Sequence, residues 1–192
     1  FKRDIITEIS ATLAFSAIQN NDKVGLLLFS DEIELFIPPK KGKTHVLRII
    51  RELLEFEPGS RRTDFTQALR YLSNVMKKKA IVFVLSDFMD EGYDNALKIV
   101  GKKHDVTGIR VYDRYEEEIP KLGMVPMKDA ETGEIVLVNT NSREVRKNYR
   151  ANYLKTVDYF ENAFTKSGSG TIHTRLDESY VKKLLSYFKR RN

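Results

Sequence analysis

The run of six apolar residues at 80–85, "AIVFVL", ends abruptly at Ser86 and Asp87. A short apolar run without polar alternation is typical of a strand that is covered on both faces of a sheet. Similar runs occur at 23–30 and 105–113, and amphipathic helical patterns separate the three. Strands that alternate with helices favour parallel pairing through right-handed crossovers. We therefore predict an α/β fold with an open, mostly parallel, Rossmann-like sheet and helices on both of its faces.

The segments around these strands supply the remaining elements. Residues 4–19 carry apolar side chains at the fourfold spacing of a core-facing helix. Residues 32–40 alternate and end in Pro38 and Pro39, which cannot donate to a sheet ladder, so we predict an edge strand that pairs in a hairpin. We also predict helices at 44–56, 65–77, 93–103, 142–165 and 177–190, a last strand at 171–176, and an inserted hairpin near 123–140 with Gly133 in its turn.

The composition is that of one globular domain. The chain has 192 residues, of which 41% are hydrophobic and 31% charged, so it is long enough to bury a core and is not disordered. It has no Cys, which excludes disulfides and thiolate chemistry. No apolar stretch reaches the roughly 18 residues of a membrane span. Because Phe1 opens directly onto a helical pattern, we expect sequence upstream and treat 1–192 as a single, N-terminally incomplete domain.

Basic residues are concentrated near the C-terminus. The net charge of +6 comes from 33 basic and 27 acidic residues, and residues 141–192 hold 12 of the basic but only 5 of the acidic ones. Such a surface could meet nucleic acid, an acidic partner or a membrane, although a solvated helix face is the commoner explanation. We do not expect a dedicated nucleic-acid site, but a basic nucleic-acid-binding domain remains an alternative.

Two glycine-containing stretches look like ligand loops without the spacing that such loops need. "GKT", 42–44, opens a helix, but the first glycine of a phosphate-binding loop would stand at position 37, which is Ile37. We interpret it as a helix start capped by Thr44. "SGSG", 167–170, lacks the Lys or Thr that a phosphate loop requires, and we interpret it as a flexible linker.

The histidines and one acidic run are weak candidates for a metal site. His45, His104 and His173 lie on different predicted elements without a partner at ligand spacing, so we interpret them as structural or surface residues. The run "YEEEIP", 115–120, could attract a cation, but adjacent side chains do not all point at one centre. We predict that it forms a solvated loop.

Two polar pairs remain as site candidates: Thr63 and Asp64 before one helix, and Ser86 and Asp87 at the end of a strand. Each pair has a local explanation. Thr63 or Asp64 could cap the helix, with Gln67 completing a capping box to Asp64, and Asp87 could turn the chain. However, ligands of open α/β sheets bind outside the carboxyl ends of the strands, where both loops can lie. We therefore predict a shared site.

This pattern resembles the von Willebrand factor A fold. The metal-ion-dependent adhesion site (MIDAS) of that fold uses an Asp-x-Ser-x-Ser run on the first strand, a Thr on a later loop and an Asp at a later strand end; Thr63 and Asp87 match the last two. The chain also resembles the bacterial domain-of-unknown-function 58 (DUF58) family, typically encoded beside MoxR-type AAA+ ATPases. The stretches that carry this resemblance are "NNDKVGLLLFSDEIELFIPPKKGKTHVLRII", "RRTDF", "AIVFVLSDF", "KKHDVTGIRVYD" and "DAETGE".

The resemblance also identifies what is absent. No Asp-x-Ser-x-Ser occurs in this sequence; in the family it would lie just upstream of Phe1, on a normally central strand. Its absence implies a hole in the sheet and an incomplete metal site. Mg²⁺ is a hard ion that hydroxyls and carboxylates can hold while one position stays open for a partner's carboxylate. We expect Mg²⁺ at Thr63 and Asp87 in the complete protein, with Ser86 and Asp64 in the ligand-edge loops, and no bound metal in this fragment.

The resemblance implies a protein-interaction domain rather than an enzyme. We expect it to act in the cytoplasm with a MoxR-type AAA+ ATPase in the assembly or activation of client proteins. The alternative from another class is a metal-dependent hydrolase or nuclease that uses Asp87, with the basic C-terminal helices holding phosphates. Ser, His and Asp are present, but no motif orders them into a catalytic set.

Overall fold

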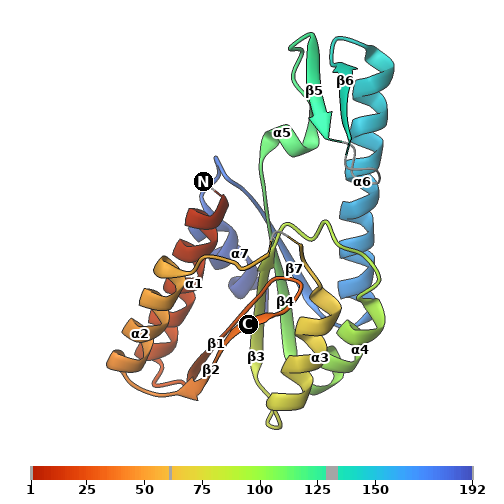
Figure 1. Cartoon of the computed structure of the whole chain (residues 1–192). Coiled ribbons are helices and arrows are strands. Elements are labelled where there is room, and N and C mark those ends of the chain that lie inside the picture. Colours follow the sequence, from red (N-terminus) through yellow and green to blue (C-terminus); the bar gives the residue numbers. More distant parts are fainter. Residues whose placement is uncertain (1, 61, 129–133, 192) are drawn as a thin grey trace.

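The computed structural model describes residues 2–60, 62–128 and 134–191 of the chain, and Figure 1 shows its helices and strands in sequence colours. The order of elements follows the predicted alternation of strands and helices. The elements are α1 (Lys2–Gln19), β1 (Val24–Phe29), β2 (Ile33–Lys40), α2 (Lys43–Glu55), α3 (Phe65–Val75), β3 (Ile81–Ser86), α4 (Asp94–Lys103), β4 (Asp105–Tyr112), α5 (Arg114–Glu117), β5 (Met124–Lys128), β6 (Ile135–Asn139), α6 (Arg143–Lys166), β7 (Gly170–Arg175) and α7 (Tyr180–Arg191).

The centre of the fold is a parallel sheet of β3, β4 and β7, with β4 in the middle. The strands are in register, so that Ser86 at the end of β3 lies beside Arg110 of β4, which lies beside His173 of β7. The apolar run at 80–85 therefore belongs to a parallel strand, as predicted. Its carboxyl end lies on the same edge as the ends of β4 and β7.

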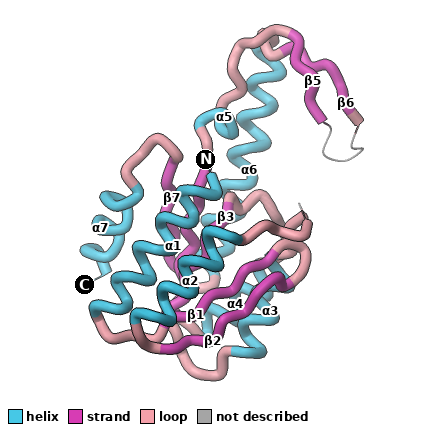
Figure 2. Tube along the Cα trace, turned by 60° about the vertical axis from the view of Figure 1, so that its left-hand side comes forward, coloured by secondary structure: helices cyan, strands magenta, loops and turns pink. Residues whose placement is uncertain are grey.

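Helices cover both faces of this sheet, which confirms the predicted α/β architecture (Figure 2). Successive residues of β4 lie on opposite faces of the sheet. Ile109 and Val111 lie in the core with α1 and α7, and Gly108 lies against α6. A Cβ at Gly108 would approach the Phe164 ring to 2.6 Å, so this position needs glycine. The core on the α3, α4 and α6 side includes Phe65, Leu69, Val84, Phe88, Tyr93, Leu97, Val100, Phe160 and Phe164.

The sheet is interrupted between β1 and β3. β1 pairs only with β2, in the predicted antiparallel hairpin, and no strand pairing among the described residues joins β1 to β3. The backbone N–H of Asp64 donates to the carbonyl of Ser30 at 2.9 Å, and the Phe29 and Phe65 rings stack with their centroids 5.9 Å apart. These contacts hold the hairpin beside α3. Among the described residues, the hairpin thus lies beside α3 as a sheet separate from β3, β4 and β7.

Two local predictions were wrong. α2 begins at Lys43 with Gly42 as its N-cap residue and no side-chain cap, because Thr44 already lies inside the first turn. The stretch 167–170 is not a flexible linker. Gly168 adopts a positive φ of 72° after the last turn of α6, and the Ser167 hydroxyl lies 2.8 Å from the Ser169 hydroxyl. This ordered turn leads directly from α6 into β7.

An arm projects from the body of the molecule (Figures 1 and 2). We use "arm" for α5, the β5–β6 hairpin and the first half of α6, described over 114–128 and 134–153. β5 and β6 pair where a hairpin was predicted, although its turn at Gly133 lies outside the described residues. In the described part of the chain, no helix combines the length and apolar content needed to cross a membrane.

Candidate functional site

A pocket of about 330 Å³ lies at the carboxyl end of β3. β3 carries Ser86 and Asp87 to this edge, and the loop before α3 brings Thr63 to the same place. Three of the four predicted site residues therefore line one pocket, although 23 or more positions separate Thr63 from the others in the sequence. The complete lining is Thr63, Phe65, Ser86, Asp87, Phe88, Met89, Asp90 and Tyr93.

Asp64, the fourth predicted residue, caps α3 instead of lining the pocket. Its carboxylate accepts a hydrogen bond from the backbone N–H of Gln67 at 2.8 Å. The predicted capping box is only half formed, because the backbone N–H of Asp64 donates to Ser30 and not to the Gln67 side chain. Asp64 thus fixes the start of α3 and, through it, the position of the neighbouring Thr63.

The turn after β3 has an unusual backbone. Phe88 adopts a positive φ of 53°, which is rare for a bulky residue, yet its side chain is only 2% exposed. Its ring packs against Phe160 with a centroid separation of 4.3 Å, and its N–H donates to the Ser86 hydroxyl at 3.2 Å. Aromatic packing therefore holds the strained turn that points Asp87 toward the pocket.

Asp90 is a pocket residue that sequence reasoning missed. Its carboxylate accepts a hydrogen bond from the backbone N–H of Phe65, the first residue of α3, at 3.2 Å. Asp90 therefore ties the loop after β3 to the helix start beside Thr63. The sequence did offer one signal for Asp90, because it is a second carboxylate that follows Asp87 by three residues. The sequence could not show which of these two carboxylates is used for this structural link.

Lys2 is a charged partner of Asp87. Its ammonium lies 3.2 Å from an Asp87 carboxylate oxygen and 2.5 Å from a Glu116 oxygen. Burial alone would lower the pKa of Lys2, but the two carboxylates outweigh it and raise the pKa above its ordinary value. The acidic run around Glu116 is therefore not the solvated loop that we predicted. It starts in α5, and Glu117 and Glu118 pair with Arg150.

We expect Lys2→Met to lower the free energy of unfolding by about 1 kcal/mol at neutral pH, because it leaves two carboxylates without their cation. The raised pKa gives the sign of the pH dependence. The stabilisation is fully present below pH 10.5, the ordinary lysine value, and is lost as pH rises through the raised folded value. Urea unfolding at neutral and at high pH measures this difference. Lys2→Arg should behave like the wild type, and a Lys2→Met deficit that persists undiminished at high pH would contradict the assignment.

The pocket lining includes side-chain oxygens that could act as ligands of a hard cation. A Thr hydroxyl and an Asp carboxylate are oxygen donors of the kind that Mg²⁺ prefers, and the ion keeps several waters when it binds. Within the described ranges, no group of three or more His, Asp or Glu side chains is placed to hold a metal. Thr63 and Asp87 thus bring one hydroxyl and one carboxylate to the same pocket.

The histidines have structural contacts, in agreement with their interpretation from sequence. His45 Nε2 lies 2.8 Å from the carbonyl of Val24. Buried His104 accepts a hydrogen bond from the N–H of Ala80 through Nδ1 at 3.2 Å. His173 lies 3.0 Å from a Glu161 carboxylate oxygen and stands two strands away from Ser86 in the sheet.

Arg110 is a second residue that the sequence did not single out. It is only 1% exposed, and its guanidinium lies over the rings of Tyr112 and Tyr153 at 4.6 and 4.9 Å from their centroids. Its Nη2 atom is buried without a hydrogen-bond partner among the described residues. A full positive charge is thus buried beside Ser86 in the sheet, where it stacks on two tyrosine rings and forms no ion pair with the described residues.

Two solved structures share this arrangement of elements. The conserved hypothetical protein BatB from Bacteroides thetaiotaomicron aligns with a TM-score of 0.51 at 17% identity, over 93% of this chain and 83% of that one. An aerotolerance-related membrane protein from Bacteroides fragilis aligns with a TM-score of 0.52 at 17% identity, over 93% of this chain and 85% of its own. With its carboxyl-edge pocket and helices on both faces, the chain has the von Willebrand factor A-like fold that the sequence predicted.

Within that class, residues 1–158 match the family described as "Protein of unknown function DUF58", and the chain belongs to this family. Uncharacterized protein Mb1516 of Mycobacterium bovis is 24% identical over 135 residues, which are 69% of this chain and 43% of the relative. Uncharacterized protein MAV169 of Mycobacterium avium is 22% identical over 165 residues, which are 81% of this chain and 93% of the relative. The chain thus spans less than half the length of the first of these relatives.

Proposed function

We propose that this chain is a non-enzymatic protein-interaction domain whose carboxyl-edge pocket contributes to a metal-ion-dependent adhesion-type site. The observation that carries the proposal is the convergence of Thr63, Ser86 and Asp87 on one pocket at the end of β3. This pocket adjoins the interruption between β1 and β3. A strand in that interruption would end at the same edge and could supply the missing ligands.

Each pocket residue has a distinct role in this proposal. Bound Mg²⁺ would supply a positive charge that attracts a carboxylate of the partner protein. Thr63 would contact the ion through its hydroxyl, and Asp87 directly or through a water. Ser86 shapes the loop by accepting the hydrogen bond from the Phe88 N–H. Lys2 partly neutralises Asp87 until the cation takes its place.

The chemistry of the lining favours binding over catalysis. Besides Asp87 and Asp90, the titratable lining residue is Tyr93, and burial raises the pKa of its hydroxyl well above the ordinary value. A tyrosine with a raised pKa stays protonated at neutral pH, so it is a poor general base. Asp90 is already engaged with the N–H of Phe65. This pattern supports a domain that grips an acidic group without cleaving a bond.

We further propose that the partner is a MoxR-type AAA+ ATPase, with which the domain assembles or activates client proteins in the cytoplasm. This step rests on the resemblance to DUF58 proteins, and family membership supports it. The cation site gives the partnership a chemical requirement: the contact should need a divalent ion and an acidic side chain on the ATPase or the client.

Binding to the neighbouring ATPase tests the function. The protein should be produced with whatever sequence precedes Phe1 in the gene, and its affinity for a MoxR-type ATPase from the same genome measured with Mg²⁺ and with a chelator. We expect the chelator and Asp87→Ala each to weaken binding at least about tenfold. Asp158→Ala, which removes an exposed carboxylate of α6, should have no effect. Binding that persists in both the chelator and the variant would refute the proposal.

A further inference from the structure

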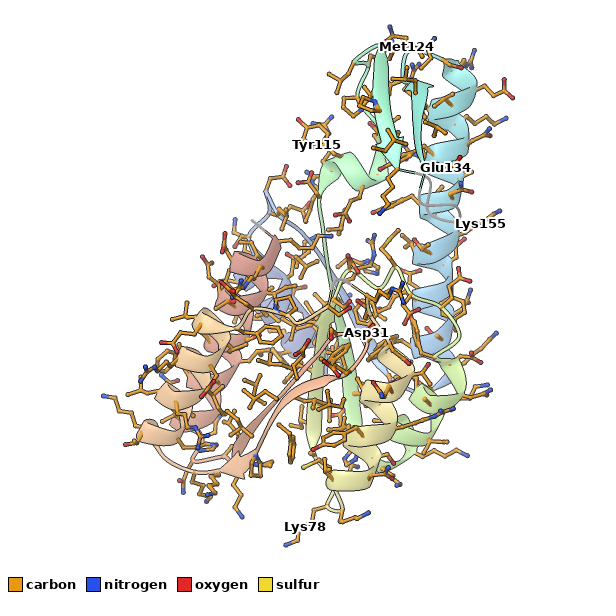
Figure 3. All side chains as sticks on the ribbon, in the orientation of Figure 1. Asp31, Lys78, Tyr115, Met124, Glu134 and Lys155 are labelled. Atoms are coloured by element: carbon orange, nitrogen blue, oxygen red, sulfur yellow. The ribbon has the colours of Figure 1, made fainter. Side chains whose placement is uncertain are left out.

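Lys2 bridges two carboxylates that belong to different parts of the molecule. Its ammonium lies 3.2 Å from Asp87 at the pocket and 2.5 Å from Glu116 of α5, at the base of the arm. Figure 3 places Tyr115, the neighbour of Glu116, where the arm leaves the body. Lys2 itself is the first residue of α1. One ammonium therefore joins the start of α1, the end of β3 and the arm.

The bridge is partly shielded from solvent. The side chain of Lys2 is 29% exposed and that of Glu116 is 28% exposed, so water and salt screen this pair less than an ordinary surface pair. Within the described ranges, neither Asp87 nor Glu116 forms an ion pair with another cationic side chain. A positive charge that approaches Asp87 must therefore compete with Lys2 for the carboxylate.

Glu116 can hold the ammonium of Lys2 without Asp87. Its second carboxylate oxygen is buried and has no hydrogen-bond partner among the described residues. The arm holds α5 in place, because the Tyr149 hydroxyl of α6 donates to the carbonyl of Tyr115 at 3.0 Å. Lys2 therefore keeps a fixed second partner when its contact with Asp87 is lost.

We propose that Lys2 is a built-in competitor of the cation at Asp87, and that a bound cation leaves the ammonium to Glu116 alone. This inference rests on the proposed function, because it concerns the regulation of the same site. Two positive charges at one carboxylate repel each other, so binding of the ion and binding of Lys2 to Asp87 oppose each other. Lys2 thus lowers the affinity of the pocket for a cation.

The competition couples the pocket to the arm. The apparent affinity of a ligand falls when the protein must first leave a state that cannot bind it. A partner that contacts the arm and draws Lys2 toward Glu116 would therefore raise the affinity for the cation. By linkage, the cation would strengthen the binding of that partner by the same factor.

Calorimetric titration of Mg²⁺ into the protein extended by whatever sequence precedes Phe1 in the gene tests the competition. We expect Lys2→Met to bind Mg²⁺ at least about fivefold more tightly than the wild type. Lys2→Arg keeps the charge and should bind as the wild type does. Lys78→Met is the matched control, because it removes an exposed lysine beyond the opposite end of β3 (Figure 3). Its affinity for Mg²⁺ should be unchanged.

Glu116→Gln separates the transfer of Lys2 from simple attraction of the ion. In the wild type, this substitution removes the carboxylate that receives the ammonium as well as a negative charge near the ion. In Lys2→Met, it removes only the charge. We therefore expect Glu116→Gln to weaken Mg²⁺ binding by a larger factor in the wild type than in Lys2→Met. Circular dichroism shows whether each variant is folded.

Chemical modification reports on Lys2 directly. The rate at which N-hydroxysuccinimidyl acetate modifies Lys2, measured by mass spectrometry, should rise several-fold when Mg²⁺ is added to the wild type, because the ammonium then has one carboxylate instead of two. The rate should not rise in Asp87→Ala, and Lys78 serves as the internal reference in both proteins.

The outcomes distinguish failure of the competition from failure of the cation site. Mg²⁺ binding by Lys2→Met that is no tighter than that of the wild type would overturn the competition and leave the cation site intact. A modification rate at Lys2 that stays constant while Mg²⁺ binds would have the same meaning. No Mg²⁺ binding by either the wild type or Lys2→Met would overturn the cation site itself, and the competition with it.

Discussion

Replacing Phe88 by alanine is expected to lower the free energy of unfolding by about 4 kcal/mol, the usual cost of removing a buried phenylalanine ring. Phe88 is 2% exposed and packs against Phe65, Phe160 and Phe164, so the substitution leaves a cavity among three rings. Alanine also keeps the unfavourable positive φ while losing the packing that holds it. Urea unfolding followed by circular dichroism gives the change.

The neighbouring residue provides the control for Phe88→Ala. Met89 is 48% exposed, so Met89→Ala should lower the free energy of unfolding by less than about 1 kcal/mol. The two substitutions lie at adjacent residues of one turn, and their effects on the free energy of unfolding should thus differ several-fold. If the two variants unfolded at the same urea concentration, aromatic packing would not be what holds the turn after β3.

Replacing Arg110 by methionine is expected to raise the free energy of unfolding by about 2 kcal/mol. Burying a charge without a carboxylate costs several kcal/mol, and stacking on two tyrosine rings returns only about 2 kcal/mol. The guanidinium of Arg110 has this environment: it is 1% exposed, contacts Tyr112 and Tyr153, and leaves Nη2 without a partner among the described residues. Methionine has a similar length and carries no charge.

Arg110→Lys is the matched variant for this prediction. It keeps the buried charge but loses the planar group that stacks on the tyrosines, so its free energy of unfolding should fall below that of the wild type. The order of stability follows from the midpoints of urea unfolding of the wild type, Arg110→Met and Arg110→Lys, measured at one pH. A methionine variant less stable than the wild type would contradict the prediction, because it would mean that the guanidinium is compensated in the folded protein.

The sheet and part of the pocket were predictable because they follow from local patterns. The apolar run before Ser86 indicated a covered parallel strand, and the general rule for open sheets placed Asp87 at the ligand edge. The loop before α3 was assigned to the same edge for the same reason. In the structure, Thr63, Ser86 and Asp87 line one pocket.

The remaining features depend on tertiary contacts that no local pattern encodes. Lys2 meets Asp87 across 85 positions of sequence, so no spacing rule could pair them. Arg110 stands inside an apolar strand, and its stacking partner Tyr153 belongs to a helix far along the chain. The positive φ of Phe88 could not be predicted from the sequence, because bulky residues rarely adopt this backbone conformation. Likewise, Asp64 and Thr63 were equally good helix caps until the backbone showed which of them bonds to Gln67.

The most direct test of the proposed site is calorimetric titration of Mg²⁺ into the protein extended by whatever sequence precedes Phe1 in the gene. We predict saturable binding in the wild type, weakened at least about tenfold by Asp87→Ala and also weakened by Thr63→Ala. Asp158→Ala, with an exposed carboxylate removed from α6, should bind as the wild type does. Equal Mg²⁺ binding in the wild type and in Asp87→Ala, or no binding in either, would contradict the assignment of Thr63 and Asp87 to a cation site.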